Sequence, residues 1–349
     1  MARERIISGD ATPDEQQPDR FAPALRPRKL DEYVGQPELI EKIRISVQAS
    51  IMRGEPMEHV LLSGPPGLGK TTLAYIIAEA VNNAPPHITS GPALAKPGDL
   101  VGLLTNLRKG DVLFIDEIHR LPIIVEEYLY PAIENFQIDI TMDTGPHAKT
   151  MNIPLQPFTL IGATTRSGLI SGPMRSRFGI AHHLNFYSPE DLLKILSRSA
   201  VLLEVNAEPD ALALIASRSR GTPRVANRLL RRVRDFALVR GHGKVSPDVL
   251  EQALQLEGID TLGLDPLDRR FLAILARDYE GGPAGIEALA ATMGEERDTL
   301  EDVVEPFLLQ IGFIRRTPKG RQMTAAAYAH LGLKRPLISP PAAQQDQLF

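Results

Sequence analysis

The segment GPPGLGKT, at residues 64–71, has the residue types and the spacing of a phosphate-binding loop. In such loops the glycines, here Gly67 and Gly69 among them, let backbone N–H groups close around phosphate oxygens. Lys70 is placed to reach the β- and γ-phosphates of a nucleotide, and the Thr71 hydroxyl to bind Mg²⁺. The alternative is a glycine-rich turn without a ligand. A strand-like run, HVLLSG, precedes the segment and a helical run, TLAYIIAEAV, follows it, which favours a nucleotide site.

Two adjacent acids provide the second part of such a site. The apolar run VLFI, residues 112–115, reads as a buried strand and leads directly into Asp116 and Glu117. Beside a phosphate loop, Asp116 would hold Mg²⁺ through water, and Glu117 would orient and deprotonate the attacking water. The alternative is a pair of acids that caps a strand end. A glutamate here favours hydrolysis, because a pure binding switch does not need one. His119 is assigned no role.

Three further polar groups follow along the chain. The run FTLIGATT ends in Thr164 and Thr165, and a hydroxyl beside the two acids can sense a γ-phosphate. Arg175 and Arg177 lie in a segment bounded by Gly and Pro, which suits an arginine finger, although a solvated surface fits equally well. Arg224 places a cation in the first turn of a helix, where the dipole disfavours it. This position indicates an anionic partner such as a phosphate.

A parallel sheet would bring these residues together. From about residue 59 to residue 187, helical patterns alternate with the strand-like runs HVLLSG, VLFID, FTLIGATT and AHHLNF. That alternation is typical of an α/β fold with helices on both faces of a parallel sheet. We therefore assign residues 21–187 to a large P-loop ATPase domain, preceded by a polar, mobile arm at residues 1–20.

The pattern changes after residue 187. A hydroxyl residue followed by proline predicts three helix starts, at Ser188, Thr222 and Ser246. These starts predict a small, all-helical lid domain over residues 188–258. Two short helices, a longer helix and a hairpin then predict a winged-helix domain over residues 259–336, followed by a tail at residues 337–349.

The predicted winged helix separates its charges. Its third helix, about residues 296–310, starts within GEERDTLEDVVE, which holds six acids and one arginine, so phosphates would repel it. The hairpin GFIRRTPKGRQMT, residues 312–324, has four basic residues and no acid. Such a hairpin can grip a DNA backbone without reading bases. A solvated basic hairpin is the alternative.

The segment QIDITMDTGPHAKTMNIPLQPF, residues 137–158, predicts a second hairpin. Apolar and polar residues alternate on both sides of the turn-like TGPHAK. The apolar residues are Ile138, Ile140, Met142, Met151, Ile153 and Leu155. The apolar face either packs on its own domain or forms a protruding docking surface.

The composition sets outer limits on function. The chain has 349 residues, a formal net charge of −4 and no cysteine, which excludes a disulfide framework and a thiolate metal site. No run of 18 apolar residues is present to span a bilayer, and the N-terminus has no apolar signal stretch. We therefore expect a cytoplasmic protein without membrane contact.

Taken in order, these motifs resemble those of the AAA+ ATPases, namely Walker A, Walker B, sensor 1, arginine finger and sensor 2. Six stretches are similar to those of one AAA+ family, the RuvB family of bacterial Holliday-junction branch-migration motors: LRPRKLDEYVGQ, LLSGPPGLGKTTLA, VLFIDEIHRL, LIGATTR, RSRFG and RGTPRVANRLLRR. The resemblance covers about residues 21–333.

This resemblance implies roles for individual residues. It selects Thr165 as sensor 1, Arg224 as sensor 2 and Arg177 as a finger acting on the neighbouring subunit's ATP. It implies contacts to the nucleotide and its Mg²⁺ from Leu25, Arg26, Gly67, Lys70, Thr71, Thr72 and Tyr187. It implies DNA contacts from Arg297, Arg316 and Arg321.

The same resemblance implies an activity. A homo-hexameric ring would hydrolyse ATP, pull duplex DNA and move four-way junctions in homologous recombination and repair. The hairpin at residues 137–158 would bind a RuvA-type junction-recognition protein, and a junction resolvase is a further candidate partner.

Two other classes of AAA+ protein compete with this interpretation. An initiator-type ATP switch can carry a winged helix without translocating, but the acidic third helix counts against it. A sliding-clamp loader shares the ATPase core, but the basic hairpin at residues 312–324 replaces the helical collar expected there. Steady, DNA-stimulated turnover would separate a motor from a switch.

Overall fold

The computed structural model describes residues 22–141 and 150–334. Contacts within the chain divide it into two compact units, with the boundary between residues 254 and 255. Three predicted segments lie outside the described residues: the arm at 1–20, TGPHAK at 144–149 and the tail at 337–349. Within the described part of the chain, no helix is long and apolar enough to cross a membrane.

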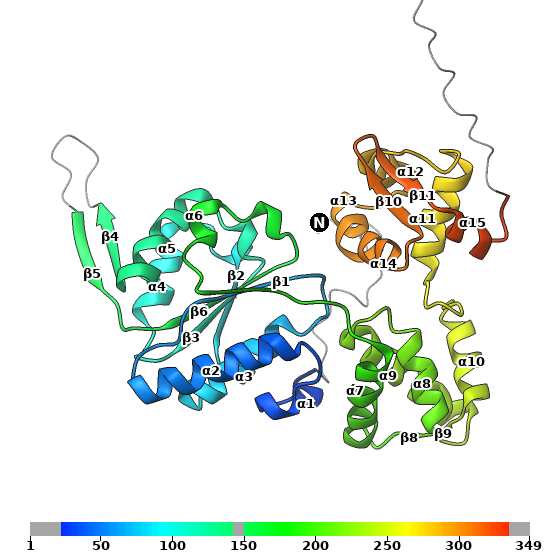
Figure 1. Ribbon diagram of the computed structural model, residues 1–349, viewed down its shortest axis with the longest axis horizontal. Coiled ribbons are helices and arrows are strands. Elements are labelled where there is room, and N and C mark those ends of the chain that lie inside the picture. The colour runs from blue at the N-terminus through cyan, green and yellow to red at the C-terminus, as the bar shows by residue number, and fades with distance from the viewer. Residues whose placement is uncertain (1–21, 142–149, 335–349) are drawn as a thin grey trace, which may run out of the picture. The chain divides into compact units, whose positions relative to one another are not determined.

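A five-stranded parallel sheet lies at the centre of the first unit (Figure 1). In sequence its strands are β1 (Val60–Ser63), β2 (His87–Ser90), β3 (Val112–Asp116), β6 (Thr159–Thr164) and β7 (Ile180–His183). In space they lie in the order β2-β3-β6-β1-β7. Because β6 lies between β3 and β1, the carboxyl ends of these three strands meet at one edge of the sheet. The predicted α/β fold is confirmed, and its topology explains how distant motifs come together.

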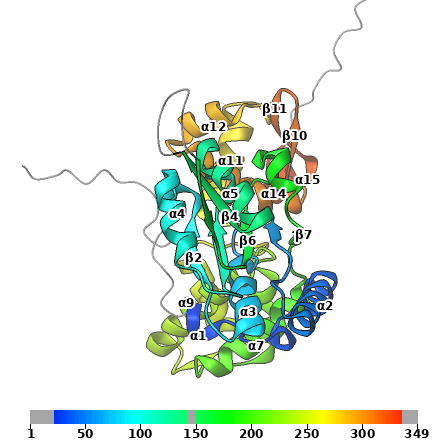
Figure 2. The same ribbon diagram turned by 90° about the vertical axis from the view of Figure 1, so that its left-hand side faces the viewer.

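Helices cover both faces of this sheet (Figures 1 and 2). On one face, α3 (Lys70–Asn82) contacts β3 and β6 and packs against α2 (Pro37–Arg53). On the other face, α4 (Pro97–Thr105) and α5 (Ile123–Asn135) share a buried core with strand side chains. That core includes Leu61, Leu100, Leu104, Leu113, Ile115, Leu129, Ile133 and Leu160. Two short helices, α1 (Ala22–Leu25) and α6 (Gly172–Arg175), complete this part of the unit.

The edge strand β2 is the one strand of this sheet that the apolar runs did not indicate. Its sequence, HITS, contains a single apolar residue, and Ile88 is 46% exposed. It pairs with β3 on one side only, so it needs little apolar surface to be stable there. Its position depends on tertiary pairing rather than on its own residue pattern.

The predicted hairpin at residues 137–158 forms a separate two-stranded sheet of β4 (Gln137–Thr141) and β5 (Thr150–Pro154). Ile138 is fully buried in the core under α5, and Leu155, directly after β5, is also buried there. Met151 is 45% exposed. The base of the hairpin therefore packs on its own domain, while the paired strands β4 and β5 extend away from the central sheet (Figure 1).

A helical region follows the sheet within the same unit. It contains α7 (Pro189–Leu202), α8 (Pro209–Ser217), α9 (Pro223–Arg240) and all but the last two residues of α10 (Pro247–Leu256). The predicted hydroxyl caps are present, because Ser188 accepts from the Asp191 N–H at 3.1 Å and Thr222 from the Val225 N–H at 3.4 Å. The sequence predicted an all-helical region, which is wrong in one detail. The strands β8 (Asn206–Ala207) and β9 (Lys244–Val245) form a short parallel pair. Two-residue strands are too short to produce a periodic signal.

The second unit has the predicted order of three helices and a hairpin. Its helices are α11 (Pro266–Arg277), α12 (Ile286–Met293) and a third that runs through α13 (Arg297–Thr299), a π-helical segment (Leu300–Val304) and α14 (Glu305–Gln310). The hairpin pairs β10 (Ile314–Thr317) with β11 (Gly320–Met323), and α15 (Ala325–His330) follows. Their core includes Phe271, Leu275, Leu289, Leu300, Leu308 and Met323.

Candidate nucleotide-binding site

The loop between β1 and α3 has a backbone shape that only glycine adopts easily. Gly64, Gly67 and Gly69 have φ angles of 134°, 83° and 97°, all positive. A Cβ atom on Gly64 would lie 2.8 Å from the Leu184 carbonyl oxygen, and one on Gly67 would lie 2.9 Å from Arg224 Cβ. The glycines therefore serve both the curvature of the loop and its close packing against neighbours.

Lys70, the first residue of α3, directs its ammonium group back over this loop. Its Nζ donates to the carbonyl oxygens of Gly64 at 2.7 Å and Pro65 at 2.9 Å, and the residue is buried. Thr71 and Thr72 follow in the first helical turn, both half-buried. The positive end of the helix and the lysine thus lie at the same loop, as phosphate binding requires.

The two acids lie at the end of β3. Burial raises the pKa of Asp116, while the Glu117 backbone N–H, which donates to Asp116 Oδ1 at 2.9 Å, and the Lys70 charge lower it. Glu117 has a φ of 48°, unusual for a residue other than glycine, and its carboxylate pairs with Arg120 at 3.0 Å. The acid assigned to water activation thus sits on a strained backbone.

The residues near Asp116 fit a magnesium ion held mainly by phosphate and water. Among the described residues, no group of three or more His, Cys, Asp or Glu side chains could form a complete metal cage. Mg²⁺ usually keeps several waters and takes only one or two protein ligands beside the phosphates. The Thr71 hydroxyl and the Asp116 carboxylate are donors of the required oxygen type.

The end of β6 distinguishes the two candidate threonines. Thr164 is fully buried, and its hydroxyl lies 3.0 Å from His119 Nδ1 and accepts the Arg166 N–H at 3.0 Å. Thr165 comes next in the chain and is half-buried. Because the Thr164 hydroxyl is held inside the protein, the geometry favours Thr165 for contact with a ligand. His119, to which the sequence assigned no role, helps to fix this strand end.

A pair of tyrosines supports the phosphate loop from the side. The Tyr187 hydroxyl lies 2.9 Å from the Tyr33 hydroxyl and 3.3 Å from the Leu68 carbonyl oxygen. Burial raises the pKa of Tyr187 to about 12 and also raises that of Tyr33, so both stay protonated and able to donate. Tyr33 was not among the predicted site residues. A tyrosine outside the loop carries no sequence signal for this contact.

The segment before α2 also reaches α3. Leu25, at the end of α1, is buried, and the Arg26 guanidinium lies 4.3 Å from the centre of the Tyr75 ring on α3. This cation–π contact brings the two residues that the resemblance implied for nucleotide binding to the helix that follows the phosphate loop.

Arg224 lies where the helical region touches the phosphate loop. Its backbone N–H donates to the Gly67 carbonyl oxygen at 3.4 Å, and its Cβ leaves no room for a side chain at Gly67. Tyr187 donates its backbone N–H to Gly221 at 2.9 Å, at the turn before α9. The predicted sensor 2 residue is thus placed directly against the loop.

Arg177 is held by residues of its own domain. Its guanidinium lies 4.2 Å from the Tyr130 ring centre, its Nε lies 3.1 Å from Glu134 Oε1, and it donates to the Pro173 carbonyl at 2.7 Å. Tyr130 and Glu134 are four residues apart on α5, so they share one helix face. Arg175 instead donates to the Ser167 carbonyl. Arg177 therefore has a defined setting apart from the phosphate loop of its own chain.

Comparison with known proteins gives the same order of domains. A model of the Holliday junction DNA helicase RuvB P-loop domain matches residues 25–184. A model of the RuvB AAA lid domain matches residues 187–260, and one of the RuvB C-terminal winged helix domain matches residues 261–332. The chain belongs to the RuvB family. The predicted family, the AAA+ fold and the winged helix are confirmed.

Individual relatives agree with this assignment. The chain is 52% identical over 350 residues to the Holliday junction branch migration complex subunit RuvB of Myxococcus xanthus, covering 100% of this chain and 99% of that protein. It is 53% identical over 324 residues to the subunit of the same name from Kosmotoga olearia, covering 93% and 94%. The chain is also 50% identical to the solved structure of the Thermotoga maritima RuvB Holliday junction branch migration motor. The TM-score is 0.83, and the match covers 90% of this chain and 100% of that one.

Proposed function

We propose that this RuvB-family protein is an ATP-driven motor that promotes branch migration of Holliday junctions. One observation carries the proposal. The phosphate loop, the acids of β3 and the end of β6 meet at one sheet edge, in a chain whose relatives are named branch-migration subunits. A sensor arginine from α9 touches the same loop. Nucleotide hydrolysis and DNA handling are therefore assigned to one chain.

The residues of the site divide the work of hydrolysis. The loop amides, Lys70 and the N-terminus of α3 bind the phosphates and offset their negative charge. Thr71 and Asp116 would hold Mg²⁺, which supplies positive charge beside the phosphates when it is bound. Glu117 takes a proton from the attacking water once its carboxylate exchanges Arg120 for that water. Thr165 contacts the γ-phosphate.

Arg177 completes the site of a neighbouring subunit in a homo-hexameric ring. Support comes from its setting, because its contacts in its own chain are to α5 and to Pro173. A guanidinium that reaches a γ-phosphate across an interface stabilises the charge of the transition state. Arg224 and Tyr187 then connect the nucleotide to the helical region, so that a change at the phosphates alters the position of α9.

The winged helix grips duplex DNA through its phosphates. Arg297, Arg316 and Arg321 supply the cations, and the hairpin presents two of them on paired strands. Backbone contacts carry no sequence information, which suits a protein that moves along its track.

The hairpin of β4 and β5 is the proposed docking site for a RuvA-type junction-recognition protein. Its base is anchored by Ile138, while Met151 remains exposed for a partner. A junction resolvase is a further partner proposed for the complex, without a surface assigned to it.

The test of this function is unwinding of a synthetic four-way junction, measured with ATP and with a RuvA-type partner. We expect partner-stimulated, ATP-dependent strand separation and steady DNA-stimulated hydrolysis. Lys70→Ala should abolish both, because the loop loses the cation that binds the β- and γ-phosphates. Hydrolysis limited to one event per DNA-bound protein would instead favour a switch of the initiator type.

A further inference from the structure

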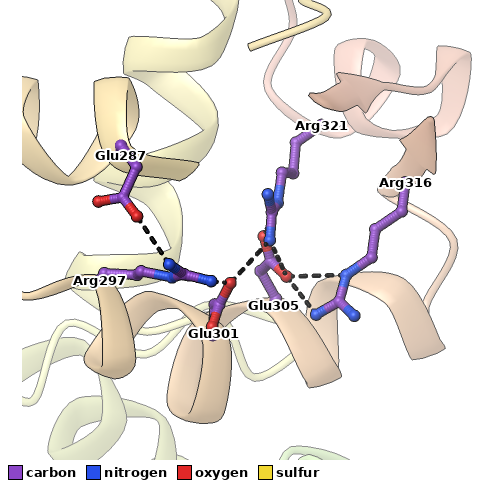
Figure 3. A network of polar contacts seen from close by, with 6 residues as sticks. All are labelled: Glu287, Arg297, Glu301, Glu305, Arg316 and Arg321. Carbon is purple, nitrogen blue, oxygen red and sulfur yellow. Dashed lines mark hydrogen bonds and ion pairs between the residues drawn. The ribbon is translucent and has the colours of Figure 1, made fainter. Parts of the chain in front are cut away.

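The second unit contains a continuous chain of ion pairs between the third helix and the hairpin (Figure 3). Acids and arginines alternate along it, in the order Glu287, Arg297, Glu301, Arg321, Glu305 and Arg316. All three arginines proposed for DNA contact therefore have carboxylate partners within their own domain. With three acids and three arginines, this series of ion pairs has no net charge.

Within this series of ion pairs, Glu305 lies between the two arginines of the hairpin, Arg316 and Arg321. Its side chain is fully buried and binds two guanidinium groups at once. Arg316 Nε donates to Oε2 at 2.9 Å, Arg321 Nη2 donates to Oε2 at 3.2 Å, and Arg321 Nε also donates to Oε1. A carboxylate without solvent exposure is stable only when paired in this way.

Glu301 extends the chain toward the start of the helix. Its Oε1 lies 3.3 Å from Arg321 Nη2 and 3.2 Å from Arg297 Nε. Glu287 on α12 then accepts from Arg297 Nη1 at 2.8 Å. Glu301 and Glu305 are four residues apart and face the same way, so one helix face holds all three arginines.

The hairpin itself needs such a partner. Arg316 and Arg321 are directly opposite each other in the register of β10 and β11. Like charges at opposite positions of a strand pair repel and destabilise the pair. The Glu305 carboxylate lies between the two guanidiniums and offsets this repulsion, so both side chains stay on the same side of the hairpin.

Exposure separates the three arginines into two kinds. The side chains of Arg316 and Arg297 are 54% and 51% exposed, whereas that of Arg321 is 15% exposed. A guanidinium has five N–H donors, so the two exposed arginines can bind phosphate with N–H groups that the carboxylates do not use. Arg321 has less exposed surface for a phosphate, and it also connects Glu301 to Glu305.

We propose that Glu305, assisted by Glu301, is a positioning residue for DNA binding. It holds Arg316 directly, and Arg297 through Arg321 and Glu301, in one fixed arrangement that meets the phosphates. A fixed guanidinium loses less conformational freedom on binding than a mobile one does. The inference rests on the proposed function, because it requires that the arginines contact DNA.

The test is Glu305→Gln in the full-length protein, with affinity for a duplex DNA measured across salt concentrations. The substitution removes one negative charge, so simple electrostatics predicts tighter binding and a steeper salt dependence. Positioning predicts the opposite, with binding weaker by about threefold to tenfold, as for residues coupled within one network. Glu296→Gln is the matched control, because Glu296 is an exposed acid at the start of the same helix and undergoes the same charge change. It should not weaken binding.

Glu301→Gln provides a second variant in case a buried amide at position 305 prevents folding. Its side chain is 15% exposed, and the same loss of affinity is expected, with the melting temperature measured in parallel. In an Arg316→Ala background the effect of Glu305→Gln should shrink, since the arginine it orients is gone.

The outcomes separate this inference from the proposed function. DNA binding by Glu305→Gln or Glu301→Gln that equals or exceeds that of the unchanged protein would overturn the positioning role. Unchanged DNA binding by the double variant Arg316→Ala with Arg321→Ala would instead overturn the role of the hairpin in DNA contact.

Discussion

Among single residues, Arg177 is the one whose contacts bear most directly on how neighbouring subunits would cooperate in the proposed ring. Its guanidinium is stacked on Tyr130 and paired with Glu134. In the proposed ring it must exchange the Glu134 carboxylate for the phosphate of a neighbour. Its side chain is 20% exposed, so part of the group is already accessible from outside the domain.

Mixed rings test this arrangement directly. Arg177→Ala alone should reduce ATP hydrolysis by about 10³- to 10⁵-fold, the range seen when an arginine finger is removed. Glu117→Gln alone should also stop hydrolysis, because the attacking water loses its base. When the two variants are mixed, some interfaces combine an intact Glu117 with an intact Arg177 from the neighbour. We therefore expect hydrolysis to recover partly, measured as phosphate release against the mixing ratio. A mixture as inactive as its components would place the finger in its own subunit's site.

The residues with motif roles could be predicted from the sequence, but the residues that contact them and hold them in place could not. Lys70 and Asp116 stand out because they match the spacing and context of a phosphate-binding site, and Arg224 because a cation in the first turn of a helix opposes the helix dipole. Tyr33 and His119 contact the site only because β6, β1 and the segment after α1 come together in the fold. A hydroxyl or an imidazole in a loop gives no sign of such a contact before the topology is known.

Among the elements, the hairpin of β4 and β5 combines the two roles that the sequence left open. Ile138 is fully buried, so Ile138→Ala should lower the free energy of unfolding by about 2–4 kcal/mol through a cavity in the core. Met151 is 45% exposed, so Met151→Ser should leave stability almost unchanged. Thermal unfolding measures the first effect.

The proposed docking role of the exposed Met151 is tested by measuring binding of a RuvA-type partner. We expect Met151→Ser to weaken that binding while the melting temperature stays within the error of the unchanged protein. Full partner affinity in this variant would mean that the docking surface lies elsewhere in the chain.

The third helix of the winged helix is where reasoning from charge alone was incomplete. Six acids around its start suggested a surface that phosphates would repel, and two of them, Glu301 and Glu305, instead face the arginines of the domain. Composition counts charges without saying which way they point. The pairing follows from the register of β10 with β11 and from the helix face opposite it.

At the scale of the whole molecule, DNA binding should depend strongly on salt and little on sequence. In a plot of the logarithm of the binding constant against the logarithm of salt concentration, each phosphate neutralised adds about −0.9 to the slope. Binding isotherms on duplexes of unrelated sequence should therefore give similar affinities and similar negative slopes. A large preference for one sequence would mean that the third helix reads bases after all.

The order of the chain's parts was predictable because each carries its own periodic signal. The alternation up to residue 187, the capped helix starts and the final hairpin each indicate one architecture. The short strands β2, β8 and β9 were missed, because two to four residues with few apolar side chains form strands only where a partner is already in place.

The contact between Gly67 and Arg224 has a mechanical consequence. Gly67 contributes no side chain of its own, so the loop backbone accepts directly from the Arg224 N–H and packs against the side chains of Thr222 and Arg224 at the start of α9. Closely packed protein interiors are nearly incompressible and transmit strain. In the proposed motor, we therefore expect a shift of the loop at the phosphates to tilt α9, a helix of eighteen residues.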